Sequence, residues 1–120
     1  MAFQLIENLD IKLPEDLDID ELFIGYTDLQ DLPDLFKYTK LTRLYCQNNM
    51  IMQLDNLPST LLELNCSDNW MTQLNNLPSG LQILDCSYCK ITELDNLPSS
   101  IQQLYCSNNQ ITQLDNLPPR

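Results

Sequence analysis

The sequence contains no histidine, only two glycines, and only six basic residues against seventeen acids. Without histidine, the chain lacks the commonest general base and the commonest zinc ligand of proteins. The formal net charge of −11 repels nucleic acid and anionic lipid, so we expect neither as a partner. No stretch approaches the roughly 18 apolar residues of a membrane span, and no basic region followed by an apolar run opens the chain. We therefore expect a cytosolic protein with reduced thiols.

What the sequence does contain is a repeat of twenty residues. Four copies follow one another without a gap: LTRLYCQNNMIMQLDNLPST, LLELNCSDNWMTQLNNLPSG, LQILDCSYCKITELDNLPSS and IQQLYCSNNQITQLDNLPPR. A longer and more divergent copy precedes them and aligns through Ile19, Leu22, Ile24, Leu29, Leu32 and Leu35. The expected organisation is an N-terminal cap at 1–18, with an edge strand near 8–12, followed by repeats at 19–40, 41–60, 61–80, 81–100 and 101–120 and no C-terminal cap.

The pattern within one copy predicts a short strand and an extended return. Positions 4 and 6 are apolar and alternate with polar residues, which is typical of a strand of about five residues with one buried face. The proline near the end of each copy fixes φ and removes a donor, so the return should be extended. In the first copy, Pro33 could open a short helix that carries Leu35 and Phe36 inward. Since one copy cannot bury its own apolar side, the copies must stack.

Each 20-residue copy follows the pattern LxxLxCxxNx(I/M)xxLxxLP, with one Cys in place of the Asn, and this pattern resembles the leucine-rich-repeat consensus. The LP after the last leucine resembles the LPX repeats of bacterial effectors, and the wording CSxNxITxLDNLP is similar to repeats of bacterial and giant-virus leucine-rich proteins. The resemblance implies a right-handed solenoid of the α/β class, with a parallel sheet on the concave face, a mostly extended convex side and little helix. It also implies protein binding as the usual activity.

The tetrapeptide CSYC at 86–89 has the CxxC spacing of metal and disulfide-exchange sites. Its first cysteine occupies position 6 of the repeat, and its second occupies position 9, where most copies have asparagine. One CxxC supplies only two of the four ligands of a zinc site, so a structural role is favoured over metal binding or redox chemistry. We therefore expect no metal, no cofactor and no disulfide, with the fourth copy as the loosest part of the asparagine column. The residues assigned this structural role are Cys46, Cys66, Cys86, Cys106, Asn49, Asn69, Cys89 and Asn109.

Positions 3, 5, 7 and 8 are expected to point outward, and they vary between copies whereas the leucines do not. Aromatic residues and arginine most often anchor interfaces. The candidate partner-binding residues are Phe23, Tyr26, Arg43, Tyr45, Tyr88 and Tyr105, together with Trp70 at position 10. The alternative is that tyrosine merely tolerates a half-exposed strand. Trp70 either forms an apolar patch beside Met50 or packs over the leucine ladder.

The favoured hypothesis is a non-catalytic protein-interaction scaffold with a partner on the concave face. One alternative is a fragment or targeting module of a larger effector whose catalytic domain is absent here, and another is a repeat remnant without a dedicated partner. Enzymatic activity is not expected, because serine and threonine occur without a histidine base. The final copy should expose one side of Ile101, Leu104, Ile111, Leu114 and Leu117, which fits a fragment, end-to-end self-association or fraying. The expected location is the cytosol, or the host cytosol for a viral or bacterial effector.

Overall fold

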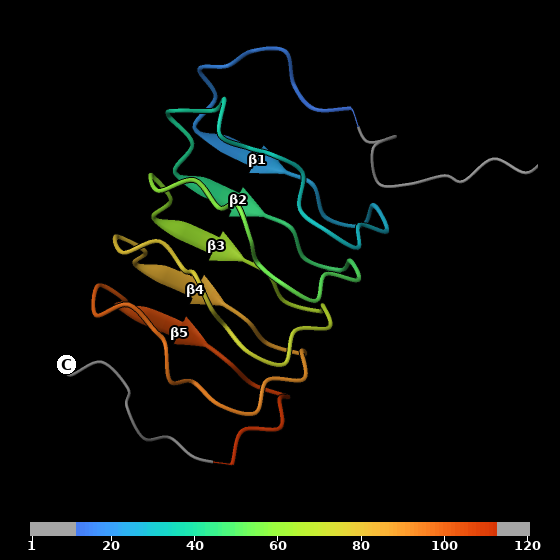
Figure 1. The fold of residues 1–120 in the computed structure, drawn as a ribbon, viewed down its shortest axis with the longest axis vertical. Coiled ribbons are helices and arrows are strands. Elements are labelled where there is room, and N and C mark those ends of the chain that lie inside the picture. The colour runs from blue at the N-terminus through green and yellow to red at the C-terminus, as the bar shows by residue number, and fades with distance from the viewer. Residues whose placement is uncertain (1–11, 113–120) are drawn as a thin grey trace, which may run out of the picture.

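Each repeat contributes one short strand to a single parallel sheet. The computed structural model describes residues 12–112. The strands are β1 (Glu21–Phe23), β2 (Arg43–Tyr45), β3 (Glu63–Asn65), β4 (Ile83–Asp85) and β5 (Gln103–Tyr105). They lie side by side in chain order, all parallel, and each return segment passes behind them to the next strand (Figure 1). The expected solenoid with a parallel sheet and little helix is confirmed, and residues 12–112 contain no helix.

Some sequence expectations fall outside the described range. The edge strand expected near 8–12 lies almost wholly there, as do most of the N-terminal cap and the end of the last repeat from 113 onward. Within residues 12–112, no helix is long and apolar enough to cross a bilayer.

The strands pair in the register of the repeat. Leu44 lies opposite Leu22 on one side and Leu64 on the other, and Leu64 and Leu84 continue the same row. Because the register equals the repeat, equivalent positions stack upon one another from coil to coil. Leucine at position 4 therefore forms a column whose three middle members are fully buried. Full burial of one such side chain stabilises the fold by about 1.5–3 kcal/mol.

Four further columns complete the core. Positions 1, 6, 11 and 14 point inward together with position 4. Their buried members are Ile24, Leu29, Leu32, Leu41, Cys46, Ile51, Leu54, Leu61, Cys66, Met71, Leu74, Leu81, Cys86, Ile91, Leu94 and Ile101. The core is thus one continuous stack of side chains behind the sheet, and no coil has a separate core of its own.

The strands span three residues each, two fewer than the pattern predicts. Three residues after the end of each strand, position 8 turns the backbone into the left-handed region. The φ angles there are 60° at Tyr26, 57° at Asn48, 52° at Asp68, 56° at Tyr88 and 57° at Asn108. Cross-coil hydrogen bonds nevertheless continue past the strands. The Cys46 N–H donates to the carbonyl of Asn65 at 2.8 Å, and the Asn48 N–H donates to that of Ser67 at 3.0 Å.

The expectation that position 7 points outward is wrong for the middle of the stack. Gly25, Ser67 and Ser87 are buried, and Gln47 is half-buried. The carbonyls of Gln47, Ser67 and Ser87 accept hydrogen bonds from the N–H at position 8 of the preceding coil, as the Gln47 carbonyl does from Tyr26 at 3.1 Å, which holds this turn tightly between neighbours. Ser107, with no later coil stacked on it in the described range, is exposed.

The first copy differs from its prediction after Pro33. No helix forms there. Leu35 is buried as expected, whereas Phe36 is 59% exposed. The ring that turns inward is Tyr38, which is fully buried and donates its hydroxyl to the Pro14 carbonyl at 2.6 Å. The inward residues of this turn, Leu35 and Tyr38, are three positions apart. Tyr38, two residues after Phe36, therefore fills the core in its place.

The last described coil is less covered than those before it. Leu104, Cys106 and Ile111 are half-buried, whereas Leu84, Cys86 and Ile91 are fully buried. Ile101 differs from the expectation, because it is only 5% exposed. Ile101 is the first residue of its coil, and its side chain packs into the core of the preceding coils.

Candidate partner-binding face

The open face of the sheet is formed by the side chains at positions 3 and 5 of the five strands. They point away from the core, opposite to the leucine column, and are half-buried or exposed. The residues of the open face are Glu21, Phe23, Arg43, Tyr45, Glu63, Asn65, Ile83, Asp85, Gln103 and Tyr105. Because the strands are in register, each position forms a row that crosses all five strands. Four of the seven predicted partner-binding residues, namely Phe23, Arg43, Tyr45 and Tyr105, lie on this face.

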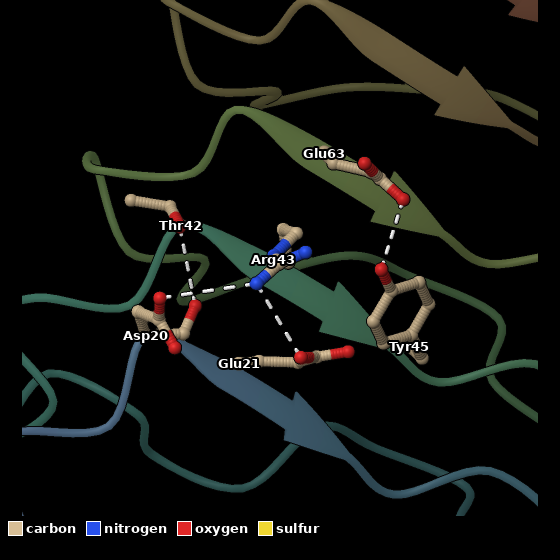
Figure 2. A network of polar contacts seen from close by, with 6 residues as sticks. All are labelled: Asp20, Glu21, Thr42, Arg43, Tyr45 and Glu63. Atoms are coloured by element: carbon tan, nitrogen blue, oxygen red, sulfur yellow. Dashed lines mark hydrogen bonds and ion pairs between the residues drawn. The ribbon is translucent and has the colours of Figure 1, made fainter.

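Arg43 is held between two acids at the β1 edge of the open face. Its guanidinium lies 3.4 Å from the Glu21 carboxylate and 3.8 Å from that of Asp20 (Figure 2). The Thr42 hydroxyl donates to the backbone carbonyl of Asp20 at 3.2 Å, which ties β2 to the start of β1. These ion pairs are solvent-exposed, so each adds about 0–1 kcal/mol at most. They orient the arginine more than they stabilise the fold.

Tyr45 joins this cluster to the next strand. Its hydroxyl donates to the Glu63 carboxylate at 3.0 Å, and its ring lies 6.3 Å from that of Phe23, tilted by 33° (Figure 2). Burial raises the pKa of Tyr45 above its ordinary value, and the hydrogen bond and negative charge of Glu63 raise it further. The tyrosine is therefore a neutral donor at physiological pH. The sequence patterns identified Tyr45 but gave no particular role to Glu63 or Asp20, which lie on neighbouring strands or strand ends.

The half of the open face on β4 and β5 has a different chemistry. Asp85 accepts a hydrogen bond from the Ser87 N–H at 3.1 Å, as Asn65 does from Ser67 at the same distance one coil earlier. The Tyr105 hydroxyl donates to the side-chain oxygen of Gln103 at 3.2 Å. Ile83 is the aliphatic member of this half. No basic side chain belongs to the open face on these two strands.

The rim beside the carboxyl ends of the strands is formed by position 8. It carries Tyr26, Asn48, Asp68, Tyr88 and Asn108, all exposed and all at positive φ. Two of the predicted partner-binding residues, Tyr26 and Tyr88, therefore lie on the rim beside the open face. Asparagine and aspartate tolerate this conformation well, whereas bulky residues rarely adopt it. The two tyrosines are thus the unusual members of the rim.

Trp70 lies two residues past the rim, at position 10. Its side chain is 50% exposed, and its backbone N–H donates to the Ile51 carbonyl at 2.9 Å. Met50, one coil earlier at the same position, is half-buried. The tryptophan is therefore neither enclosed in the core nor part of the open face.

The asparagines at position 9 lie inside the turn that follows each strand. The amide nitrogen of Asn49 donates to the carbonyls of Ile24 and Cys46, both at 3.0 Å, and its oxygen accepts from the Leu29 N–H at 2.9 Å. Asn69 and Asn109 repeat the arrangement in their own coils. Each amide thus pairs backbone groups that would otherwise be buried without a partner.

Cys89 takes the asparagine place in the fourth copy. Its thiol donates to the carbonyls of Cys66 at 3.5 Å and Ser87 at 3.6 Å. Burial raises the pKa of Cys89, an effect that the nearby N–H groups of Asn69 and Met71 partly oppose. Burial also raises the pKa of Cys46, to about 12, and that of Cys86. Thiols of this kind are poor nucleophiles and poor metal ligands at neutral pH.

All five cysteines are free, and four of them are buried. Among residues 12–112, no group of three or more histidine, cysteine, aspartate or glutamate side chains is placed to hold a metal ion. The two cysteines of the CSYC tetrapeptide are buried in the fourth coil, where their thiols are packing atoms of positions 6 and 9.

Comparisons with known proteins agree with this architecture. A family model described as leucine-rich repeats in two copies matches residues 79–119. The solved leucine-rich-repeat domain of a Shigella effector superimposes with a TM-score of 0.75 at 32% identity, over 83% of this chain and 45% of that one. YopM from Yersinia enterocolitica WA-314 superimposes with a TM-score of 0.63 at 29% identity, over 91% of this chain and 28% of that one. No curated protein matches the chain significantly.

The stacked register, the leucine columns and the asparagine turns define a leucine-rich-repeat solenoid. The chain is a leucine-rich-repeat protein similar to the repeat domains of bacterial effectors. It spans less than half the length of each of the two solved structures.

Proposed function

We propose that the chain is a non-catalytic scaffold that binds a partner protein on the open face of its sheet, the concave face of this architecture. The observation that carries the proposal is the contrast between the two sides of each strand. The inward residue at position 4 is leucine in every coil, whereas the pair of outward residues at positions 3 and 5 is a different combination in each coil and includes exposed aromatics. A rigid sheet with varied, exposed aromatic and charged side chains is suited to recognising another protein.

The absence of an assembled catalytic pair on the open face supports a non-catalytic role. Among the described residues of that face, the hydroxyl of Tyr45 faces a carboxylate, and no serine, threonine or cysteine faces a base there. A nucleophile needs such a neighbour. The free thiols of the core suit a reducing compartment, so the proposed location is the cytosol, or the host cytosol for an effector.

A second candidate is a targeting module of a larger effector. It is favoured by the likeness to the Shigella effector domain, of which this chain covers 45%. In that case the same face would select the partner while another domain acts on it. The experiment below addresses binding in both cases.

The test is cross-linking of the purified chain in an extract of its native host, followed by mass spectrometry of captured proteins. The face variant combines Arg43→Gln and Tyr45→Ala, and the matched control combines Met52→Ala and Gln53→Ala on an exposed return segment. We expect a reproducible set of proteins to be lost from the face variant and retained by the control, at equal thermal stability. Equal capture by wild type and both variants would contradict binding on the open face.

A further inference from the structure

The charges of the open face and rim are unevenly distributed. Arg43 is the one base at positions 3, 5 and 8 of the described coils, and it is already paired with Asp20 and Glu21. From β3 onward, these positions contain the acids Glu63, Asp68 and Asp85 and no base. The nearest base along the chain is Lys90, exposed at position 10 beyond the rim. This half of the surface therefore has an unbalanced negative potential.

Exposed aromatic rings flank these acids. Tyr88 on the rim is 57% exposed, and Tyr105 on β5 is 53% exposed. Tyr88 is not among the residues of the buried core. An aromatic face beside carboxylates is the arrangement that attracts a guanidinium or ammonium group.

The backbone at Tyr88 gives an independent reason to assign its ring a role. Its φ is 56°, and the same rim position holds Asn48 and Asn108 at 57°. Asparagine reaches this conformation at little cost, whereas tyrosine does so at a steric cost. Replacing tyrosine by asparagine should therefore stabilise the fold. A residue that weakens the fold while exposing its side chain fits selection for contact with another molecule.

From these observations we infer that the open face and rim over β3, β4 and β5 bind an extended, arginine-rich segment of a partner protein. The inference rests on the proposed function, because it names the chemistry of the partner. Guanidinium groups would pair with the carboxylates of Glu63, Asp68 and Asp85 and lie over the rings of Tyr88 and Tyr105. Neighbouring strands are about 4.8 Å apart, so β3, β4 and β5 span about 10 Å, or about three extended residues.

Other occupants fit this surface less well. A second copy of the chain would present the same acids and be repelled, and nucleic acid would be repelled by its phosphates. An acidic segment would be repelled in the same way. The positive charge of the occupant is therefore the property to test.

The experiment measures binding of an eight-residue peptide of alternating arginine and threonine by isothermal titration calorimetry. The matched probe replaces every arginine by citrulline, which keeps the shape and removes the charge, and a third probe carries glutamate instead. We expect the arginine peptide to bind, with an affinity that falls as salt rises. We expect the citrulline and glutamate peptides to bind at least tenfold more weakly.

The repeat itself supplies conservative variants and a control. Asp85→Asn introduces the residue that occupies the equivalent position of the preceding coil, Asn65. Tyr88→Asn introduces the residue that occupies the equivalent position of the next coil, Asn108. Each should weaken the arginine peptide about two- to fivefold, and Tyr88→Asn should also raise the melting temperature. The control Asp55→Asn makes the same charge change on the return segment, where the next coil has Asn75, and should leave the affinity unchanged.

Two results would overturn the inference. One is equal affinity for the arginine and citrulline peptides. The other is an equal loss of affinity in Asp85→Asn and Asp55→Asn, which would indicate attraction to net charge alone. Neither result would contradict the proposed function, which the cross-linking experiment tests separately. A partner protein that is lost from the Arg43 and Tyr45 variant could still bind the open face through chemistry other than arginine recognition.

Discussion

The side-chain oxygen of Asn69 accepts a hydrogen bond at 2.9 Å from the backbone N–H of Ile51, which belongs to the preceding coil. The amide nitrogen of the same residue donates to the carbonyls of Cys46 in that coil and Cys66 in its own, both at 3.1 Å. One buried side chain therefore joins two coils at the turn where their strands end. The leucine columns provide the apolar stabilisation, and the asparagine column fixes the distance and register between coils.

Replacing Asn69 with alanine should destabilise the fold by about 2–4 kcal/mol, because buried backbone groups of two coils lose their partner. Guanidinium unfolding monitored by circular dichroism measures the change. Asn75, an exposed asparagine of the return segment, provides the control, and its alanine variant should change stability by less than about 0.5 kcal/mol. Similar effects of the two substitutions would contradict the role given to the asparagine column.

Replacing Cys89 with asparagine should stabilise the chain by about 0.5–1.5 kcal/mol. The thiol makes long contacts of 3.5 and 3.6 Å with the carbonyls of Cys66 and Ser87, and it is a weaker partner than the amide that occupies this place in other coils. The same denaturant titration measures the gain. A loss of stability would mean that the fourth coil is packed around sulfur and cannot accept the amide.

The two glycines should respond oppositely to alanine. A Cβ at Gly25 would lie 2.8 Å from the backbone carbonyl oxygen of Gln47, so Gly25→Ala should destabilise the fold by about 1–3 kcal/mol. A Cβ at Gly80 meets nothing within 4 Å, and neither glycine has a positive φ, so Gly80→Ala should be neutral or stabilise by up to about 1 kcal/mol. Melting temperatures of the two variants give the comparison. Equal losses at both positions would be inconsistent with the close approach at Gly25.

The buried thiols should make stability fall in alkali. Burial raises the pKa of Cys46 to about 12 from an ordinary value of 9.0, and it raises the pKa of Cys66 and Cys86 in the same direction. The unfolded chain releases these protons first, so the stabilisation is complete below about pH 9 and declines as the pH rises toward 12. Chemical unfolding between pH 7 and 11 tests this.

The same burial predicts the kinetics of thiol labelling. At pH 8, Ellman's reagent should react slowly with the folded chain and rapidly with all five thiols in denaturant. The Cys106 thiol, the one that is only half-buried, should react first. Fast labelling of all five in the folded state would show that the coils open readily.

Trp70 should report a partly exposed indole. It is the single tryptophan of the chain and is 50% exposed, so its emission should lie to the red of a buried indole and be quenched strongly by acrylamide. Replacing it with glutamine, the residue at the same position of the last copy, should change stability by less than about 0.5 kcal/mol. Weak quenching would place the ring over the leucine ladder instead.

The leucine columns were predictable because their period is a local property of the chain. Leu44 and Leu64 stand at the same place in adjacent copies, and once copies stack, the register follows. The burial of Tyr38 was not predictable, because it depends on the turn after Pro33. The other four copies do not contain this turn, so they offer no comparison for it. The burial of Ser67 was missed for another reason, since it arises from a neighbouring coil and not from alternation within the strand.

On the open face, too, the sequence predicts some features and misses others. The sequence identified Tyr45 and Arg43 as candidates from residue type and position. It did not identify Glu63 as the acceptor for the Tyr45 hydroxyl, because that contact joins residues eighteen apart whose side chains must lean across two strands. Pairings between surface side chains depend on rotamers, which repeat periodicity does not determine.

From β2 to β5, each strand residue pairs with its counterpart twenty positions later, so the junctions between these four coils are built alike. If residues 61–80 were removed as a unit, Leu44 would meet Leu84 as it now meets Leu64, and Asn65 of the lost coil would be replaced by Asp85 beside Tyr45. Whole-unit duplication or deletion in the gene can therefore lengthen or shorten the array and reshuffle its recognition surface in one step, without requiring a new interior.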